Sequence, residues 1–279
     1  MYFNSVGVPE CPNWTGFSLI MPAVSVGNIG QLTCDLLINT FKLTKTGCFS
    51  DQSLQPLCGN DAFHSTGIAA GKLVTSAEVF ESQEKKIVVI QQRAALVQGR
   101  AGEFRRKLIE WIKEKGFSRV ILITSCFAYE KTDAIIQSNT CRYLMTPSLE
   151  AKKDEFVSNL LKYPQLEKKP AEEGLELPRQ PDDIPEAARD IRLSGGGIAR
   201  KLFIDCCKED VPMAVLLLFC AEGDNTPHAM MMASFTNALL HLIPEPTKLP
   251  AGTPPWKAMW RPPASWIMLF GGPVDPTIY

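Results

Sequence analysis

The chain has 279 residues, 45% of them hydrophobic, and its 29 Lys and Arg almost balance its 30 Asp and Glu, which leaves a net charge of −1. This length and apolar content suit one large domain with a substantial core, and the balance of charge excludes a general electrostatic attraction to nucleic acid or to a membrane surface. The chain opens with no basic region followed by an apolar one, and no stretch approaches about 20 apolar residues, so we expect no secretory signal and no membrane span, and a location in the cytoplasm and nucleus.

The first predicted unit is a strand, a turn and a helix. The apolar run Phe17–Val24 predicts a buried strand that is interrupted at Pro22. Asn28, followed three residues later by Gln31, matches a capping box, which predicts that a helix begins here. The apolar face of this helix is formed by Ile29, Leu32, Leu36 and Leu37.

The turn Gly27–Gly30 has two interpretations. The free N–H groups at a helix N-terminus attract anions, so the turn could hold a phosphate group. A dinucleotide-binding fingerprint requires G-x-G-x-x-G, however, and only G-x-x-G is present. Because helix capping explains the same residues, we favour a structural turn.

The next predicted elements alternate between strands and a helix. Ala77–Ser82 and Lys86–Arg93 are predicted to be two strands joined by a polar turn. Apolar residues at helical spacing predict a helix over 104–112, which Gly116 ends, and the β-branched run 119–125 predicts a buried strand. This order predicts an α/β fold with a mainly parallel sheet that is covered on both faces.

Two segments have a different composition. Residues 165–190 contain four prolines, eight acidic and four basic residues and no aromatic residue, which predicts a flexible acidic and proline-rich insertion within a single domain spanning 1–279. Residues 244–279 contain nine prolines and three tryptophans. This composition precludes regular structure for most of the segment and predicts an extended C-terminal strap that packs across the body and ends in a tail.

Two more strand-to-helix junctions lie between these segments. Ser194–Gly197 precedes a predicted helix, and the predicted strand 213–220 leads into Glu222–Asn225. In the helix that follows, Thr226 is the predicted N-cap and Pro227 the first helical residue.

These junctions contain the candidates for chemistry. Three glycine amides ahead of a helix could form an anion-binding nest at Ser194–Gly197, or the glycines could serve only a tight turn, and the sequence leaves both interpretations open. Glu222 and Asp224 could act as an acid and a base, but acidic residues before a helix are favoured by its dipole alone, and we favour this second explanation. The corresponding alternative function is a nucleoside- or nucleotide-binding α/β enzyme.

Metal and nucleophile motifs are absent from the sequence. The nine cysteines include no C-x-x-C pair, and the three histidines include no H-E-x-x-H. We therefore predict reduced thiols, no metal, no cofactor and no catalytic residue.

Five stretches together resemble the proteasome assembly chaperone 2 family. They occur in the same order from about Gly16 to Gly272, so the resemblance covers most of the chain. The stretches are "MPAVSVGNIGQL", "RYLMTPS", "SGGGIARKL", "LLLFCAEGDN" and "SWIMLFG".

The resemblance implies a fold and a function. It implies a three-layer α/β/α sandwich without catalysis or cofactor, in an obligate heterodimer with proteasome assembly chaperone 1. The heterodimer is implied to bind proteasome α subunits, to promote formation of the α-ring of the 20S core particle and to prevent off-pathway association of rings. On this basis Gly27–Gly30 is a structural joint.

The resemblance also implies partner-binding residues at the end of the chain. Tails that carry a hydrophobic residue, a tyrosine and any third residue are implied to dock between α subunits. Here the tail is Gly271–Tyr279, and Ile278 and Tyr279 are the candidate partner-binding residues. The sequence departs from the pattern because Tyr279 is its last residue, and a frayed end is the alternative interpretation.

Overall fold

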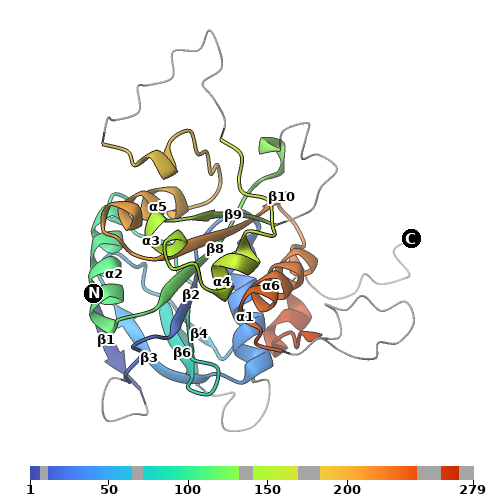
Figure 1. Cartoon of the computed structure of the whole chain (residues 1–279). Helices are drawn as coiled ribbons and strands as arrows, with labels where there is room; N and C mark the ends of the chain where they lie inside the picture. The colour runs from blue at the N-terminus through green and yellow to red at the C-terminus, as the bar shows by residue number, and fades with distance from the viewer. Residues whose placement is uncertain (7–11, 65–71, 132–140, 169–182, 244–258, 270–279) are drawn as a thin grey trace, which may run out of the picture.

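The computed structural model contains one large sheet with helices packed against it (Figure 1). The structure describes residues 1–6, 12–64, 72–131, 141–168, 183–243 and 259–269. Eight strands form the sheet in the order β1-β3-β6-β7-β2-β8-β10-β9, and β4 and β5 form a separate ribbon. The strands are β1 (Tyr2–Ser5), β2 (Ser18–Pro22), β3 (Thr44–Ser50), β4 (Cys58–Asn60), β5 (Leu73–Thr75), β6 (Ala77–Ser82), β7 (Ile87–Gln92), β8 (Arg119–Phe127), β9 (Arg142–Met145) and β10 (Met213–Cys220).

The sheet is mixed, whereas the sequence predicts a mainly parallel one. The four central strands, β7, β2, β8 and β10, run parallel, and the strands toward both edges pair antiparallel. One reason is local: only residues 83–86 join β6 to β7, and a connection this short permits only an antiparallel pair. The predicted pair of strands at 77–82 and 86–93 is confirmed as this hairpin.

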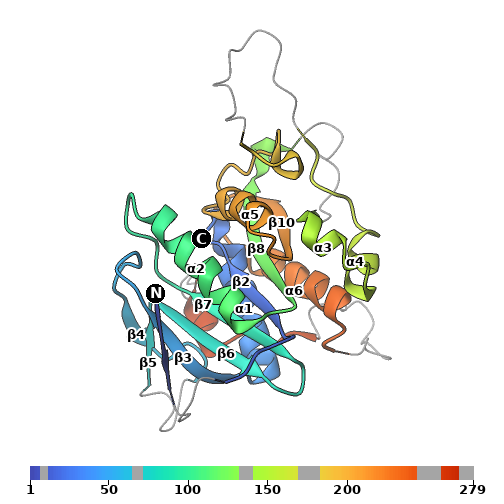
Figure 2. The ribbon, with the colours of Figure 1, turned by 60° about the vertical axis from the view of Figure 1, so that its left-hand side comes forward.

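Helices cover both faces of the sheet, as Figures 1 and 2 show. They are α1 (Ile29–Phe41), α2 (Ala101–Lys115), α3 (Pro147–Glu150), α4 (Glu155–Leu160), α5 (Ala199–Lys208) and α6 (Thr226–Leu240), with short 3-10 turns at η1 (Val26–Asn28), η3 (Ala128–Glu130), η4 (Glu186–Ala188) and η5 (Ala264–Met268). Helices α2 and α5 pack on one face, and α1, α4 and α6 on the other. Neighbouring residues of one strand therefore enter different cores: Leu19 of β2 faces α2 and α5, and Ile20 faces α1 and α6.

Strand β10 shows why the apolar runs of the sequence are continuous rather than alternating. All its residues are buried, because helices cover it on both sides. Leu216 and Leu217, which face opposite cores, have no exposed surface. Burial of each leucine contributes about 1.5–3 kcal/mol relative to an exposed position.

Helix α2 agrees with its prediction. Gly116 adopts a left-handed conformation (φ 65°) after the last helical residue, and its N–H donates to the carbonyl of Lys113 at 3.2 Å. A residue with a side chain is disfavoured in this conformation, which is why glycine ends helices. The apolar face predicted for this helix is buried in the core.

The described ends of the predicted insertion pack into the body. Leu166 on one side, and Ile184 and Ala188 on the other, are buried in the core beneath α2 and α5. Residues 169–182 lie outside the described residues.

The described part of the C-terminal segment, residues 259–269, packs against α1 and α6. Trp260 is 3% exposed, and its Nε1 donates to Ser234 Oγ of α6 at 2.8 Å. The side-chain amide of Asn39 in α1 donates to the carbonyl of Arg261 at 2.8 Å. The rest of the predicted strap lies outside the described residues.

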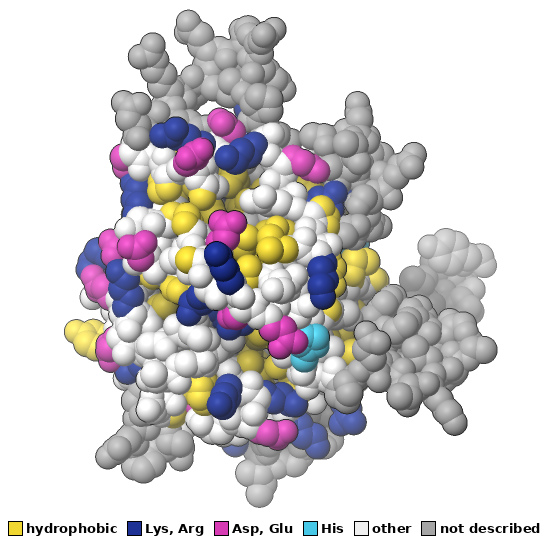
Figure 3. Space-filling model, in the orientation of Figure 1, with side chains coloured by type: hydrophobic (Ala, Val, Ile, Leu, Met, Phe, Trp, Pro, Cys, Tyr) yellow, Lys and Arg dark blue, Asp and Glu magenta, His cyan; other side chains and the backbone are white. Residues whose placement is uncertain are grey.

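The surface has a mixed character. On the face that Figure 3 shows, basic and acidic side chains are interspersed, with small apolar patches between them. Within the described ranges, every helix is too short or too polar to cross a bilayer.

Candidate functional site

Three glycine-containing junctions that the sequence singles out meet where the central strands of the sheet end. We call this place, at the carboxyl ends of β2, β8 and β10, the sheet edge. Strands β2, β8 and β10 are parallel, so their carboxyl ends lie together, and open α/β sheets place their sites at such edges. The N–H of Val26 donates to the carbonyl of Gly195 at 2.9 Å, which joins the first junction to the second. A Cβ on Gly27 would lie 2.5 Å from the side-chain amide of Asn225, so the first junction also touches the third.

The first junction is a close-packed turn, and the predicted capping box is wrong. Asn28 adopts a left-handed conformation (φ 53°), and its side chain makes no cap hydrogen bond. The amide of Gln31 donates instead to the carbonyl of Gln92 at 3.0 Å, at the end of β7. A Cβ on Gly30 would lie 2.6 Å from the carbonyl oxygen of Ile123, so glycine lets α1 start close against β8. The structural interpretation of Gly27–Gly30 is therefore supported.

The second junction, Ser194–Gly197, directs its carbonyl groups toward the sheet. The carbonyl of Gly196 accepts from Thr124 Oγ1 at 3.1 Å, and that of Ser194 accepts from the N–H of Phe127 at 3.1 Å. A Cβ on Gly197 would lie 2.2 Å from the carbonyl oxygen of Val24. These contacts favour the interpretation of Ser194–Gly197 as a tight turn in which backbones approach closely, rather than as an anion-binding nest.

The third junction ends in a turn that Asp224 closes at the start of α6. Asp224 Oδ1 accepts from the N–H of Thr226 at 2.9 Å and from its hydroxyl at 2.6 Å. Helix α6 begins at Thr226, one position earlier than predicted, and Asn225 rather than Thr226 is the N-cap residue. Glu222 and Asp224 are both exposed, so the structure favours the helix-dipole explanation over a buried acid and base.

A cavity of about 460 Å³ lies between the first and third junctions. Its lining includes Gly27, Asn28 and Gly223, together with Glu222 and the apolar Leu269 of the C-terminal segment. The lining contains one carboxylate and no basic side chain. A phosphate group would meet repulsion there, so the geometry gives no support to a nucleotide-binding site at this edge.

Two serine hydroxyl groups form hydrogen bonds beneath the first junction. Ser125 Oγ donates to the carbonyl of Val26, and the hydroxyls of Ser25 and Ser125 lie 2.7 Å apart. Since Ser125 already donates its proton to Val26, Ser25 is the donor of the pair. The two hydroxyls therefore tie η1 to β8 and are not aligned with a base.

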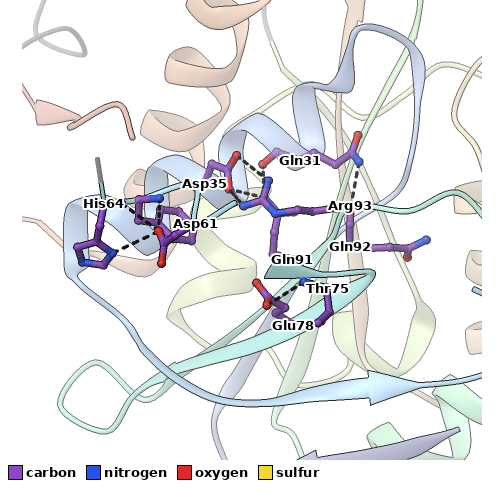
Figure 4. Close-up of polar contacts among 10 residues, drawn as sticks. Gln31, Asp35, Asp61, His64, Thr75, Glu78, Gln91, Gln92 and Arg93 are labelled. Carbon is purple, nitrogen blue, oxygen red and sulfur yellow. Dashed lines mark hydrogen bonds and ion pairs between the residues drawn. The ribbon is translucent and has the colours of Figure 1, made fainter. Parts of the chain in front are cut away.

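A buried ion pair that the sequence analysis missed lies beside α1. Arg93 Nη2 and Asp35 Oδ1 are 2.7 Å apart, and the amide of Gln91 donates to the same oxygen at 2.7 Å (Figure 4). This cluster fastens the middle of α1 to the end of β7. The sequence does contain a signal for this ion pair. Asp35 follows Leu32 by three positions and so lies on the buried face of the helix, where a charged side chain needs a partner of opposite charge.

The described cysteines are free, and several behave as core residues. Burial raises the pKa of Cys141 to about 12 and that of Cys207 to about 11, and it raises the pKa of the Cys206 thiol further still. These thiols stay protonated near neutral pH and are poor nucleophiles. Within the described ranges, no three His, Cys, Asp or Glu side chains come together as a metal site.

Comparison with known proteins identifies the family. The model of the PAC2 family matches residues 19–250, which is most of the chain. The chain belongs to the PAC2 family. Two curated relatives of this PAC2-family chain are named Proteasome assembly chaperone 2. The one from Danio rerio is 38% identical over 268 residues, covering 96% of both chains, and the one from Homo sapiens is 34% identical over 270 residues, covering 97% of both.

Solved structures share the fold of this PAC2-family chain. Pyrococcus furiosus PbaA, described as an archaeal homolog of proteasome-assembly chaperone, aligns with a TM-score of 0.58 at 14% identity over 87% of this chain and 88% of its own. Pyrococcus furiosus PbaB, described as an archaeal proteasome activator, aligns with a TM-score of 0.54 at 15% identity over 92% of both chains. At these identities the likeness concerns the fold alone.

The stretches that carry the family resemblance gather at the sheet edge described above. The resemblance itself is confirmed. Three stretches contain the three junctions, and a fourth, "SWIMLFG", includes Leu269 of the cavity lining. Close packing of backbones therefore accounts for the glycines in these stretches of this PAC2-family chain. The candidate partner-binding residues Ile278 and Tyr279 lie outside the described residues.

Proposed function

We propose that this chain is an assembly chaperone of the 20S proteasome. The observation that carries the proposal is its 34–38% identity, over almost the full length of both chains, to relatives named Proteasome assembly chaperone 2. The cavity at the sheet edge is lined by one carboxylate and no basic side chain, which disfavours the alternative of a nucleotide-binding enzyme that would use the glycine-rich junctions. A chaperone of this kind needs no cofactor, and it works in the cytoplasm and nucleus, where proteasomes are assembled.

The proposed working form is a heterodimer with proteasome assembly chaperone 1. It binds proteasome α subunits, promotes formation of the α-ring and covers a surface on which half-built rings would otherwise pair wrongly. Such a factor must bind the intermediate more tightly than the mature particle, since a ligand shifts an equilibrium only by its difference in affinity for two states.

Affinity capture of the tagged chain from cytosol tests the proposal. After a moderate salt wash, mass spectrometry should find a near-stoichiometric second chaperone and α subunits without mature β subunits. Capture of the chain alone, or of complete proteasomes only, would contradict it.

We also propose that Ile278 and Tyr279 bind the α-ring. A buried aromatic anchor commonly dominates a small interface, so Tyr279→Ala should reduce recovery of α subunits while the second chaperone is still recovered. The substitution Thr277→Ala in the same tail is the matched control and should leave both unchanged. Equal recovery of α subunits with Tyr279→Ala would remove the tail from the interface.

A further inference from the structure

A second cavity, of about 590 Å³, opens beside the C-terminal end of α1. We call it the α1 pocket. Its walls come from α1 with the chain that leads from it into β3, from the loop after β4, from β5, from β6 and from Arg261 of the C-terminal segment. Its apolar lining consists of Ile38, Leu43, Phe63, Leu73, Val74 and Phe80. The volume lies within the range of about 300–1,000 Å³ that is usual for ligand pockets.

The apolar lining is open to solvent at one point. Leu73, on the β5 strand, is 57% exposed, although most large apolar side chains of the chain are buried. Phe80 lies deeper in the pocket and is 5% exposed. The pocket thus offers an apolar surface that an incoming side chain could cover.

The charged lining of the pocket is unbalanced. It contains more basic than acidic side chains, namely Lys42, Lys45, Lys72 and Arg261 against Asp61 and Glu78. Both acids are engaged within the chain. Asp61 Oδ1 accepts from the N–H groups of Phe63 at 2.6 Å and His64 at 2.9 Å (Figure 4). Glu78 Oε1 lies 2.5 Å from Lys45 Nζ.

Three basic groups remain at the rim. Lys42, Lys72 and Arg261 are exposed, and none of them makes an ion pair with another residue that the structure describes. Their positive charge surrounds the apolar lining, so the pocket is complementary to an apolar group that is flanked by negative charge.

Glu78 supplies an unused acceptor inside the pocket. Its side chain is 1% exposed and points to the α1 side of the sheet, since it lies two positions from Phe80 on the same strand. Oε1 accepts from Lys45 and from the N–H of Thr75, whereas Oε2 is buried without a hydrogen-bond partner. Leaving a buried acceptor unpaired is costly, and a donor on a bound ligand would remove this cost.

We propose that the α1 pocket binds a short acidic segment of a partner protein that inserts a bulky apolar side chain. The apolar side chain covers Leu73 and Phe80, neighbouring carboxylates meet Lys42, Lys72 and Arg261, and a backbone N–H of the segment donates to Glu78 Oε2. The inference rests on the proposed function, in which the chain acts by binding proteins, and it names the chemistry of one partner segment.

Binding of labelled peptides to the full chain tests this inference. The probe is a fluorescent, end-blocked peptide of alternating aspartate and phenylalanine, and its binding is followed by fluorescence anisotropy. We expect it to bind, and we expect a peptide with lysine in place of aspartate, or with serine in place of phenylalanine, to bind at least about tenfold more weakly.

Matched variants separate a local pocket from general charge. Reversal of the rim, as Lys42→Glu, Lys72→Glu and Arg261→Glu combined, should raise the dissociation constant at least about tenfold. The control reverses three exposed charges elsewhere, as Lys152→Glu, Arg192→Glu and Lys201→Glu, and should change it less than about twofold. The single change Leu73→Ser alters an exposed side chain and should weaken binding without unfolding the chain.

Three results would overturn the proposal. The first is equal weakening of peptide binding by the two triple variants, and the second is equal binding of the acidic and basic peptides. The third is displacement of the acidic peptide by inorganic phosphate or ATP at low concentration, because this would indicate a site for small anions. Capture of α subunits by the unaltered chain is scored separately. A failure of the peptide assay with successful capture therefore rejects the pocket alone, whereas failed capture rejects the proposed function.

Discussion

At the scale of single residues, the sheet edge depends on positions that have no room for a side chain. Gly197 combines a left-handed backbone (φ 60°) with a distance of only 2.2 Å between an added Cβ and the carbonyl oxygen of Val24. Backbone atoms cannot move aside as the end of a flexible side chain can, so this contact is not easily relieved.

We expect Gly197→Ala to lower the free energy of unfolding by about 1–3 kcal/mol or more, because the strained conformation and the clash act together. Urea denaturation measures the loss. The matched control is Gly102→Ala in α2, where nothing lies within 4 Å of an added Cβ and alanine is the better helix former, so it should raise stability by about 0.5–1 kcal/mol. Equal effects of the two substitutions would refute the close-approach argument.

The carboxylate of Asp51 makes stability depend on acidic pH. Burial alone would raise the pKa of this carboxyl, but hydrogen bonds from Ser53 and Lys107 outweigh it and hold the pKa well below its ordinary value. Its side chain is 1% exposed, and Lys107 Nζ lies 3.0 Å from Oδ2, which fastens α2 to the end of β3. A depressed pKa in the folded state means that the stabilisation is present above the unfolded pKa and is lost as the pH falls below it.

We expect the unaltered chain to lose stability as the pH falls below about 4, the range in which an unfolded aspartate takes up its proton. The variant Asp51→Asn should be less stable at pH 7 and should lose less between pH 5 and pH 3. Thermal unfolding followed across this range measures both. Parallel curves for the two proteins would show that another group controls the acid response.

At the scale of elements, the sequence predicts correctly those features that depend on a few neighbouring residues. The end of α2 at Gly116 and the hairpin of β6 and β7 agree with prediction, because a C-terminal glycine and a tight polar turn act within a few residues. The edge strands β1 and β9, and β3 next to β1, were missed, since a stretch such as Thr44–Ser50 has neither a clear alternation nor an apolar run. Their pairing is decided by residues far along the chain.

The same limit applies to the sites. Each glycine junction was found in the sequence, but that Gly27 touches Asn225 depends on the strand order, which no local pattern encodes. Asn28 misled the capping prediction because a residue suited to an N-cap also tolerates the left-handed conformation that the turn requires. The α1 pocket was not predicted, because its walls come from five separate segments.

The C-terminal segment is an element whose contribution can be measured through its tryptophans. Trp260 is buried against α6, whereas Trp266 is only partly buried at the edge of the same core. We expect Trp260→Ala to cost about 3–5 kcal/mol of unfolding free energy and Trp266→Ala clearly less. Chemical denaturation of the two variants side by side tests this, and equal losses would mean that the segment packs differently from the structure described here.

At the scale of the whole molecule, several large apolar side chains remain exposed. Tyr129, Leu161, Ile267 and Leu73 have between 55% and 78% of their surface accessible, and they lie in different parts of the fold. Exposed apolar surface of this kind marks binding surfaces and promotes self-association when the binding partner is absent.

We therefore expect the chain expressed alone to form aggregates or mixed oligomers. If the proposed heterodimer is its working form, co-expression with the proposed partner, proteasome assembly chaperone 1, should give one species with the mass of a heterodimer. Light scattering coupled to size exclusion distinguishes the two states. A monodisperse monomer in isolation would contradict this expectation.

The meeting of the three junctions has a consequence for synthesis on the ribosome. Gly27 contacts Asn225, so the sheet edge closes only after β10 and the start of α6 have been translated. At about 5–20 residues per second, roughly 10–40 s separate the appearance of the two residues. In the later part of this interval β8 is present without β10, the strand with which its free backbone edge later pairs. A nascent chain of this protein is therefore most in need of protection until β10, at the start of its last quarter, has emerged.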